Sequence, residues 1–185
     1  MIVISFYTSE KYRLHAQAMR ESAESVGLKC EITQKPDLGS WWMNANQKSA
    51  FVLECLEKYG DEKLLWQDAD TRFLKYPILL DSLEHDMAAF FFSPRVPIGG
   101  TIWFNGHKAK RYVAAWAKMV QENPTREDDS INFRDALSSV KNSSIQHLPP
   151  SYCWNEKSMR ASYPGAQPII IHGYAGDHDY PVMAG

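Results

Sequence analysis

The stretch that decides the fold is LLWQDADTRF, residues 64–73. An apolar run from Leu64 to Trp66 leads directly into two carboxylates one residue apart, Asp68 and Asp70. A buried strand that ends in Asp-x-Asp places both carboxylates at the carboxyl edge of a sheet, where open α/β sheets bind their ligands. Hard carboxylate oxygens at that edge suit Mg²⁺ or Mn²⁺ bridging to a diphosphate. Aspartate is also common in turns, so a purely structural strand-end turn is the alternative interpretation.

The amino-acid composition limits the classes of protein to which the chain can belong. The chain has 185 residues, 44% of them hydrophobic and 23% charged, and we expect residues 1–185 to form a single domain. A net charge of −2 does not favour a nucleic-acid partner. No apolar run approaches the roughly 20 residues that a membrane span needs. Three widely spaced cysteines without a CxxC motif favour reduced thiols in a cytoplasmic protein.

Strand-like and helix-like segments alternate along the chain, which predicts an α/β domain built from βαβ units with helices on both faces of the sheet. Hydrophobic periodicity and the Gly and Pro positions define the segments. We expect strands at 2–7, 29–33, 63–67, 87–92, 101–105, 145–148 and 169–171, helices at about 8–26, 46–59, 78–83, 107–120 and 128–140, and a loop at 93–98.

Further candidates for chemistry stand at the ends of these segments. His172 follows three isoleucines at a strand end and could approach a metal or a phosphate, although a surface-loop histidine has the same pattern. Glu127, Asp128 and Asp129 begin a helix, where acids stabilise the helix dipole by roughly 0.3–1 kcal/mol each. Alternatively, one of these acids is a general base that deprotonates an acceptor hydroxyl.

Glycine, basic and aromatic positions complete the candidate set. Gly99 and Gly100 precede a strand and either permit close approach of a ligand to the backbone or make a tight turn. Lys48 and Arg72 are candidate phosphate partners. Three tryptophans could stack on a sugar or a base, or pack in the core: Trp41, Trp42 and Trp154.

Taken in order, these motifs resemble the glycosyltransferases with the GT-A fold. The Asp-x-Asp segment at 64–73 is the most specific part, and the resemblance covers roughly residues 1–178. It implies a single-domain, Rossmann-like α/β fold with a mixed, mostly parallel sheet. The other matching parts are Lys48 on the preceding helix, the glycine-led strand at 100–105, the acidic helix start at 127–129, the Leu-Pro segment at 148–152 and the late His172.

The resemblance also implies an activity. The chain would be a metal-dependent glycosyltransferase, of hexosyltransferase type, that moves a sugar from a nucleotide-sugar donor to a saccharide or other hydroxyl acceptor, with a UDP-sugar as the default donor. Mn²⁺ or Mg²⁺ would be held by Asp68, Asp70 and His172, and Asp128 or Asp129 would be the base of an inverting enzyme. The residues implied at the donor are Phe6, Tyr7, Thr8, Lys48, Asp68, Arg72 and Gly100.

Other functions remain open at this point. A nucleotidyltransferase or sugar-nucleotide hydrolase could use a similar sheet, but residues 7–10 lack the Gly-rich, basic turn that would hold a nucleoside triphosphate. A non-catalytic module that binds nucleotide sugars would keep the aromatic positions and need no base. A Gly-x-x-Lys-Pro-Trp element found in some families is replaced by GYAGD at 173–177, so we expect no contact from a late lysine to the diphosphate.

Overall fold

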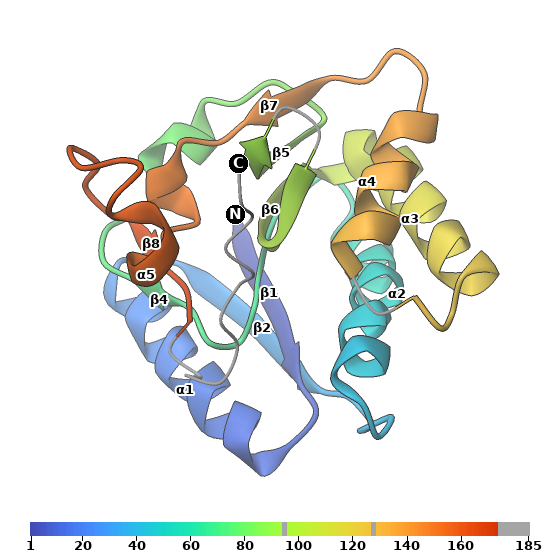
Figure 1. The fold of residues 1–185 in the computed structure, drawn as a ribbon, viewed down its shortest axis with the longest axis horizontal. Coiled ribbons are helices and arrows are strands. Elements are labelled where there is room, and N and C mark those ends of the chain that lie inside the picture. Colours follow the sequence, from blue (N-terminus) through green and yellow to red (C-terminus); the bar gives the residue numbers. More distant parts are fainter. Residues whose placement is uncertain (94–95, 127–128, 174–185) are drawn as a thin grey trace.

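The computed structural model describes residues 1–93, 96–126 and 129–173. A six-stranded sheet with strand order β2-β1-β3-β6-β5-β7 runs through the centre of the molecule (Figure 1). The pairs β1–β2, β1–β3 and β5–β7 are parallel, whereas β6 runs antiparallel to both of its neighbours. The predicted mixed, mostly parallel sheet is therefore confirmed. The strands are β1 (Ile2–Tyr7), β2 (Lys29–Gln34), β3 (Lys63–Gln67), β5 (Met87–Ser93), β6 (Val96–Asn105) and β7 (Ile145–His147).

A short two-stranded ribbon lies beside this sheet. It pairs β4 (Arg72–Phe73) with β8 (Ile170–Ile171) in antiparallel fashion, and Arg72 lies opposite Ile171. The ribbon therefore joins the chain just after the Asp-x-Asp turn to the chain just before His172. Sequence periodicity does not predict β4, because two residues are too few to show a pattern.

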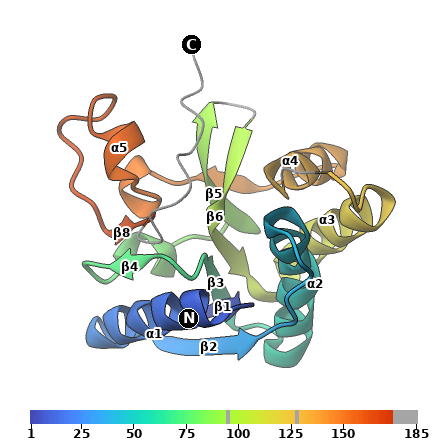
Figure 2. The same cartoon turned by 60° about the horizontal axis from the view of Figure 1, so that its bottom comes forward.

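Helices cover both faces of the sheet, as predicted. Figure 1 shows α2 (Trp41–Tyr59), α3 (Lys110–Glu122) and α4 (Asp129–Ser139) on one side, and α1 (Glu10–Ser25) and α5 (Glu156–Met159) on the other. The same separation holds in the turned view of Figure 2. Three short 3-10 helices complete the described structure: η1 (Ile78–Asp81), η2 (Gly106–Ala109) and η3 (Pro150–Tyr152).

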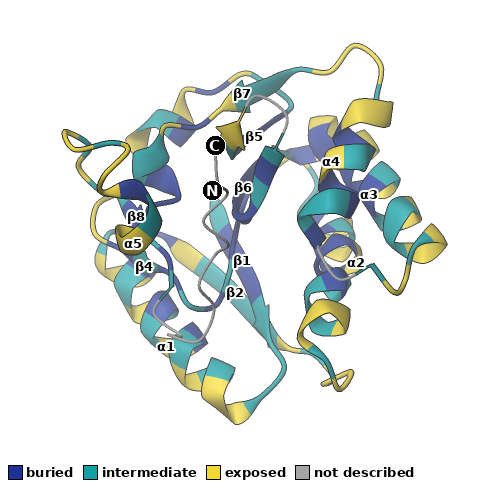
Figure 3. Ribbon diagram, in the orientation of Figure 1, coloured by how far each residue is buried: buried dark blue, intermediate teal, exposed yellow. Residues whose placement is uncertain are grey.

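Strand β3, which precedes the Asp-x-Asp turn, has an uninterrupted apolar sequence because both of its faces are buried. Leu64 and Trp66 pack toward α2, α3 and α4, whereas Leu65 belongs to the second core cluster on the opposite face. All three side chains are buried, because helices cover both faces of β3. Burying each of them contributes about 1.5–3 kcal/mol. Figure 3 shows this buried centre and the exposed outer faces of the helices.

Two predicted boundaries are wrong by several residues. Helix α2 begins at Trp41 rather than at 46, because the Ser40 side chain accepts a hydrogen bond from the Met43 backbone and caps the helix there. Strand β6 begins at Val96, inside the predicted loop at 93–98. Pro97 is tolerated in β6 because the pairing with β5 is irregular there, and prolines in strands are confined to edges and bulges.

A third boundary differs because a 3-10 turn precedes the helix. Helix α3 begins at Lys110, after η2, rather than at 107. Gly106 in that turn has φ +50, and a Cβ there would lie 2.8 Å from the Asp61 backbone. Among the described residues no helix is both long and apolar enough to span a membrane. Cys30, Cys55 and Cys153 are all free thiols, as expected.

Candidate functional site

The two aspartates of the motif lie in a turn at the carboxyl end of β3. The Asp68 backbone amide donates to the Gly100 carbonyl at 3.0 Å, and the Thr71 amide donates to the Asp68 carbonyl at 3.2 Å. Strand β3 itself pairs Gln67 with Thr101 of β6. Because β6 is antiparallel, the carboxyl end of β3 meets the first half of β6 at this edge. The turn therefore brings Asp68 directly against the predicted Gly99–Gly100 pair.

A buried lysine holds two of the predicted carboxylates together. Lys48 of α2 places its Nζ 3.1 Å from Asp68 Oδ1 and 2.8 Å from Asp129 Oδ2. The third hydrogen of this ammonium is donated to the Gly99 carbonyl at 3.1 Å. The Lys48 and Asp129 side chains are 6% and 8% exposed, whereas that of Asp68 is 29% exposed. We call Lys48, Asp68 and Asp129 the charge cluster.

Burial and pairing within the charge cluster shift the pKa values of Lys48 and Asp68. Burial by itself lowers the pKa of Lys48, but the carboxylates of Asp129 and Asp68 outweigh it and raise that pKa above its usual value. Burial raises the pKa of Asp68, although Lys48 opposes the rise. Lys48 therefore stays charged at neutral pH. All three donors of its ammonium are occupied within the protein, so its predicted contact with a donor phosphate stays a prediction.

His172 follows β8 and is buried at the same edge of the sheet. Its Nε2 lies 2.7 Å from Thr101 Oγ1, and the Thr101 hydroxyl donates to Gln67 Oε1 at 3.1 Å. As Gln67 is oriented, Thr101 has no further hydrogen to give, so His172 donates through Nε2–H and keeps a bare lone pair on Nδ1. Burial lowers the pKa of His172 to about 4, against the opposing effect of Asp70, so the ring is neutral at neutral pH.

Three polar atoms at this edge are buried without a partner among the described residues. They are His172 Nδ1, Gln67 Nε2 and Thr71 Oγ1. Asp68 Oδ1 receives the indole N–H of Trp66 at 3.1 Å, in addition to Lys48, while no described residue donates to Asp68 Oδ2. A buried ring nitrogen with a free lone pair is costly unless something binds it. The site thus offers one imidazole nitrogen and one carboxylate oxygen to a ligand.

Gly100 lies against both of these atoms. A Cβ at Gly100 would lie 2.9 Å from His172 Nδ1 and 3.3 Å from Asp68 Oδ2. Both free ligand atoms therefore face the same point above the glycine, and any side chain at this position would fill the space between them. Gly99 and Gly100 lie inside β6 rather than in a tight turn before it, and the close approach of a ligand to their backbone stays a prediction.

The third predicted metal ligand, Asp70, is half-buried in the same turn. Its carboxylate is close enough to raise the pKa of His172 against the effect of burial. In the described part of the chain, however, no three side chains among His, Cys, Asp and Glu are gathered closely enough to hold a metal by themselves. The metal set of Asp68, Asp70 and His172 thus stays a prediction.

The other predicted donor residues lie in several places. Phe6 packs edge-on against Phe51 and also contacts Trp66, with ring centroids 5.6 and 5.3 Å apart. Tyr7 and Thr8 end β1 and begin the following turn. Arg72 Nη1 donates to the carbonyls of Thr71 and His15, so its side chain lies against α1 and does not join the charge cluster.

Some predicted residues cannot be placed or turn out to be structural. Glu127 and Asp128 lie outside the described residues. Trp154 is buried, and its indole N–H donates to Glu156 at 2.8 Å, so core packing is the correct interpretation there. Sequence reasoning missed the roles of Gln67 and Trp66. A polar residue that closes an otherwise apolar strand, as Gln67 does, was the available signal.

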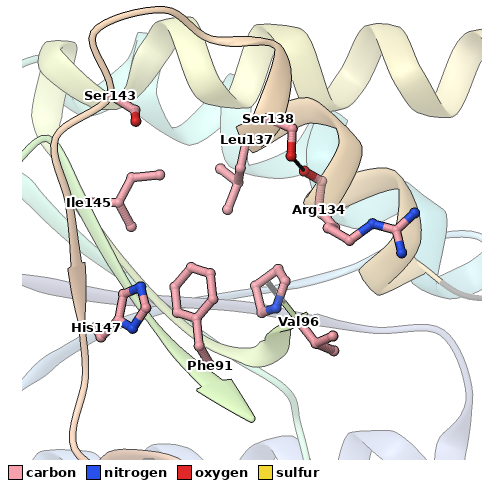
Figure 4. Close-up of a pocket in the computed structure, with 9 residues that line it drawn as sticks. Phe91, Val96, Arg134, Leu137, Ser138, Ser143, Ile145 and His147 are labelled. Carbon is pink, nitrogen blue, oxygen red and sulfur yellow. Dashed lines mark hydrogen bonds between the residues drawn. The ribbon is translucent and has the colours of Figure 1, made fainter. Parts of the chain in front are cut away.

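A separate cavity of about 570 Å³ lies between α4, β7 and the β5–β6 hairpin. Figure 4 shows the apolar side chains of Phe91, Leu137 and Ile145 around it. Arg134 and His147 lie at its rim, and the His147 ring stacks on Phe91 with centroids 4.0 Å apart. No member of the charge cluster lines this cavity.

Comparison with solved structures identifies the fold. The chain is similar to a glycosyltransferase involved in glycosylation of the major capsid of PBCV-1, with a TM-score of 0.71 and 14% identity over 92% of this chain and 91% of that one. It is similar to the glycosyltransferase GlyE of Streptococcus pneumoniae TIGR4, with a TM-score of 0.64 and 14% identity over 93% of this chain, and it spans 54% of the GlyE chain. It is also similar to the galactosyltransferase LgtC, with a TM-score of 0.62 and 9% identity over 93% of this chain and 86% of that one.

These likenesses define the class of fold. The chain has the GT-A fold of nucleotide-sugar glycosyltransferases, as the resemblance implied. The sequence itself matches no protein-family model and no curated protein. At identities of 9–14%, the structural likeness establishes the fold, and the activity has to be argued from the residues at the site.

Proposed function

We propose that this chain is a metal-dependent glycosyltransferase that moves a sugar from a nucleoside-diphosphate sugar to a hydroxyl acceptor. One observation carries the proposal: among the described residues His172 Nδ1 is buried without a partner, no side chain donates to Asp68 Oδ2, and both atoms lie within 3.3 Å of the point where a Cβ on Gly100 would stand. A carboxylate and a neutral imidazole are suitable ligands for a divalent cation. They lie at the carboxyl edge of the sheet, where α/β folds bind nucleotides.

A divalent metal fits this edge. Asp68 and His172 would hold it, with Asp70 as the third protein ligand, and Mn²⁺ or Mg²⁺ is the expected ion. Because the described side chains form no complete metal cluster, we infer that the donor diphosphate and water supply the remaining ligands, as is usual for Mg²⁺. When bound, the metal would act as a Lewis acid for the negative charge that develops on the departing diphosphate.

The chain's own residues would hold the site ready for the donor. Lys48 fixes Asp68 from the inner side, so that Oδ1 is committed to Lys48 and Trp66 while Oδ2 is left for the ligand. Thr101 fixes the His172 ring so that Nδ1 lies on the side of Gly100 and Asp68 Oδ2. Hydrogen bonds of this kind orient ligand side chains and commonly change metal affinity 10–100-fold.

The transfer exchanges one bond for another at the anomeric carbon. The bond from this carbon to the diphosphate oxygen breaks, a bond to the acceptor oxygen forms, and the hydroxyl proton passes to a base. The oxygen Oδ2 of Asp129 is held by Lys48, which leaves it unavailable as that base while the pair is intact. In an inverting enzyme we therefore assign the base to Asp128, and Asp129 positions Lys48. A hexose is the proposed sugar, UDP the proposed nucleotide and the cytoplasm the proposed location.

The structure of LgtC, which has this fold, was solved with donor and acceptor sugar analogues. This supports a nucleotide-sugar donor and a saccharide acceptor for the present chain.

Calorimetric titration of the protein with UDP and with GDP, with and without Mn²⁺, tests the proposal. We expect metal-dependent binding of one nucleotide, and its loss in Asp70→Asn with the thermal unfolding midpoint unchanged. Asp61→Asn is the matched control, because the Asp61 side chain is 94% exposed and lies at the other end of β3. A screen of UDP-glucose, UDP-galactose, UDP-N-acetylglucosamine and GDP-mannose for Mn²⁺-dependent hydrolysis would then separate an enzyme from a binding module. Unchanged affinity in Asp70→Asn would remove Asp70 from the site.

A further inference from the structure

The first turn of α2 exposes a group of large apolar side chains. Trp41 is 49% exposed, Trp42 is 36% exposed and Met43 is 42% exposed, and Leu38 in the preceding loop is 43% exposed. The other four of the six tryptophans are at most 2% exposed. Four large apolar side chains are thus exposed within six residues of sequence, and exposed apolar surface of this kind often marks a binding site.

Helical geometry shows that the two indoles belong to the inner face of α2. Residues seven apart lie on the same face of a helix, which pairs Trp41 with Lys48 and Trp42 with Ser49. Lys48 and Ser49 are both buried, and Lys48 belongs to the charge cluster. Trp41 and Trp42 therefore extend the inner face of α2 beyond the packed core. Both side chains are partly exposed there.

The topology places this surface at the edge of the candidate site. Strands β1 and β2 are parallel and end together, with Tyr7 opposite Gln34. The loop after β2 leads into α2, so α2 begins at the same carboxyl edge at which Asp68 follows β3. At 1.5 Å per residue, Trp41 lies about 10 Å farther along the helix axis than Lys48. The two indoles thus lie about two helical turns N-terminal to Lys48, at the end of α2 that follows the carboxyl edge of the sheet.

Charges near the surface argue against a membrane as its partner. Lys35 is paired with Glu54 at 2.8 Å, Lys48 is buried in the charge cluster, and Asp37 adds a negative charge. Helices that bind anionic lipid carry several Lys or Arg beside their aromatic residues. An uncharged ligand with an apolar face and polar edges suits two half-exposed indoles better, and a sugar ring has that form.

We propose that Trp41 and Trp42 form the acceptor platform, which binds a saccharide acceptor beside the donor site. The proposal rests on the proposed function and deepens it, because it identifies the acceptor as a carbohydrate and gives it a place. The acceptor ring packs its C–H face on the indoles, and its hydroxyl reaches inward along α2 toward the donor.

Iodide quenching of tryptophan fluorescence tests the binding. Because the other four tryptophans are buried, iodide reports on Trp41 and Trp42. The probes are the methyl glycosides of glucose, galactose and mannose, together with lactose and maltose. We expect at least one of them to protect the wild-type protein from iodide. Trp41→Ala and Trp42→Ala should each weaken that saccharide's affinity about tenfold, the loss typical of an aromatic anchor, and Trp41→Phe and Trp42→Phe should restore most of it.

Kinetics with the protecting saccharide tests the role. Each tryptophan-to-alanine variant should raise the KM for the acceptor about tenfold. The KM for the donor should change much less. Ile78→Ala is the control, because Ile78 is 72% exposed in η1 and should change neither constant. The phenylalanine variants keep the test valid if an alanine variant fails to fold.

Several results would overturn the proposal. The first is failure of every saccharide to protect the wild-type tryptophans, and the second is a rise in the donor KM instead of the acceptor KM. The third is self-association of the wild-type protein that the tryptophan variants abolish, because a second copy of the chain would then cover these residues. Binding of the protein to phosphatidylserine vesicles through Trp41 and Trp42 would also contradict the proposal. So would a Phe91→Ala variant, in the separate cavity, that raises the acceptor KM more than the tryptophan variants do. If the wild type shows no Mn²⁺-dependent breakdown of any donor, the proposed function fails, whereas the iodide experiment still reports on the platform.

Discussion

Replacement of Lys48 by methionine removes the cation of the charge cluster while keeping most of its side-chain volume. The change leaves a carboxylate that is 8% exposed, Asp129, and one that is 29% exposed, Asp68, without their shared partner. Breaking a buried ion pair from one side costs about 3–5 kcal/mol, because the remaining charge is left desolvated. A domain has about 5–15 kcal/mol of stability in total. We therefore expect Lys48→Met to lower the urea midpoint severely at pH 7.

The loss of stability in Lys48→Met should depend on pH in a definite direction. The pKa of Asp68 is already raised by burial, and loss of Lys48 raises it further above the unfolded value of about 3.9. A carboxyl whose folded pKa is raised costs stability when it is ionised, so the deficit of the variant is largest at pH 7 and shrinks as the pH falls toward 4. Urea unfolding of both proteins at several pH values measures the difference.

Two further variants make the argument refutable. Asp129→Asn in the Lys48→Met background removes one of the stranded charges and should recover a large part of the loss. Lys58→Met is the matched control, because Lys58 pairs with Glu31 at 2.8 Å but is 56% exposed, and exposed pairs contribute little. If Lys48→Met cost less than about 1 kcal/mol, or if its cost were independent of pH and not relieved by Asp129→Asn, the buried-charge account would be wrong.

Three other perturbations should separate the site from the scaffold. Gly100→Ala places a Cβ 2.9 Å from the His172 ring and should abolish Mn²⁺-dependent nucleotide binding in calorimetry. Gly106→Ala is the control, because its Cβ would lie 2.8 Å from the Asp61 backbone and should lower the stability of the protein without selective loss of binding. Thr101→Val removes the hydroxyl that orients His172 and should weaken Mn²⁺-dependent UDP binding about 10–100-fold, a loss that Thr101→Ser should largely repair. Burial raises the pKa of Cys30 to about 11 and those of Cys55 and Cys153 to about 12, so at pH 8 iodoacetamide should alkylate the native thiols far more slowly than the urea-unfolded ones; equal rates would contradict the raised pKa values.

The sheet was largely predictable because its strands carry strong local signals. The apolar run of Leu64 to Trp66 reports burial on both faces, and Gly27 after α1, with φ +88, terminates a helix as expected. The start of α2 was missed because Trp41 and Trp42 are apolar but half-exposed, so they fit neither a core face nor a solvent face. The start of β6 was missed because Pro97 is normally excluded from regular strands, and the bulge that admits it depends on the pairing with β5.

The convergence of Lys48, Asp68, Asp129, Gly100 and His172 at one edge could be expected in outline, whereas their contacts could not. Asp68, Gly100 and His172 could be selected because polar or glycine residues at strand ends converge at one edge of an α/β sheet. The bridge that Lys48 makes between Asp68 and Asp129 depends on distances across 81 residues of sequence, which no local pattern encodes. The same holds for the chain of hydrogen bonds from Gln67 through Thr101 to His172.

The β4–β8 ribbon has a consequence for the time at which the site is assembled. Arg72 pairs with Ile171, so His172 reaches its place only after about 100 further residues have left the ribosome, which takes roughly 5–20 s at ordinary rates of synthesis. Until then Asp68 and Asp70 lack the histidine, and Thr101 lacks its imidazole partner. Two residues per strand make the ribbon short, and the His172 amide adds a second anchor by donating to the Trp154 carbonyl at 2.7 Å, so the last member of the site to be synthesised is tied to two separate segments.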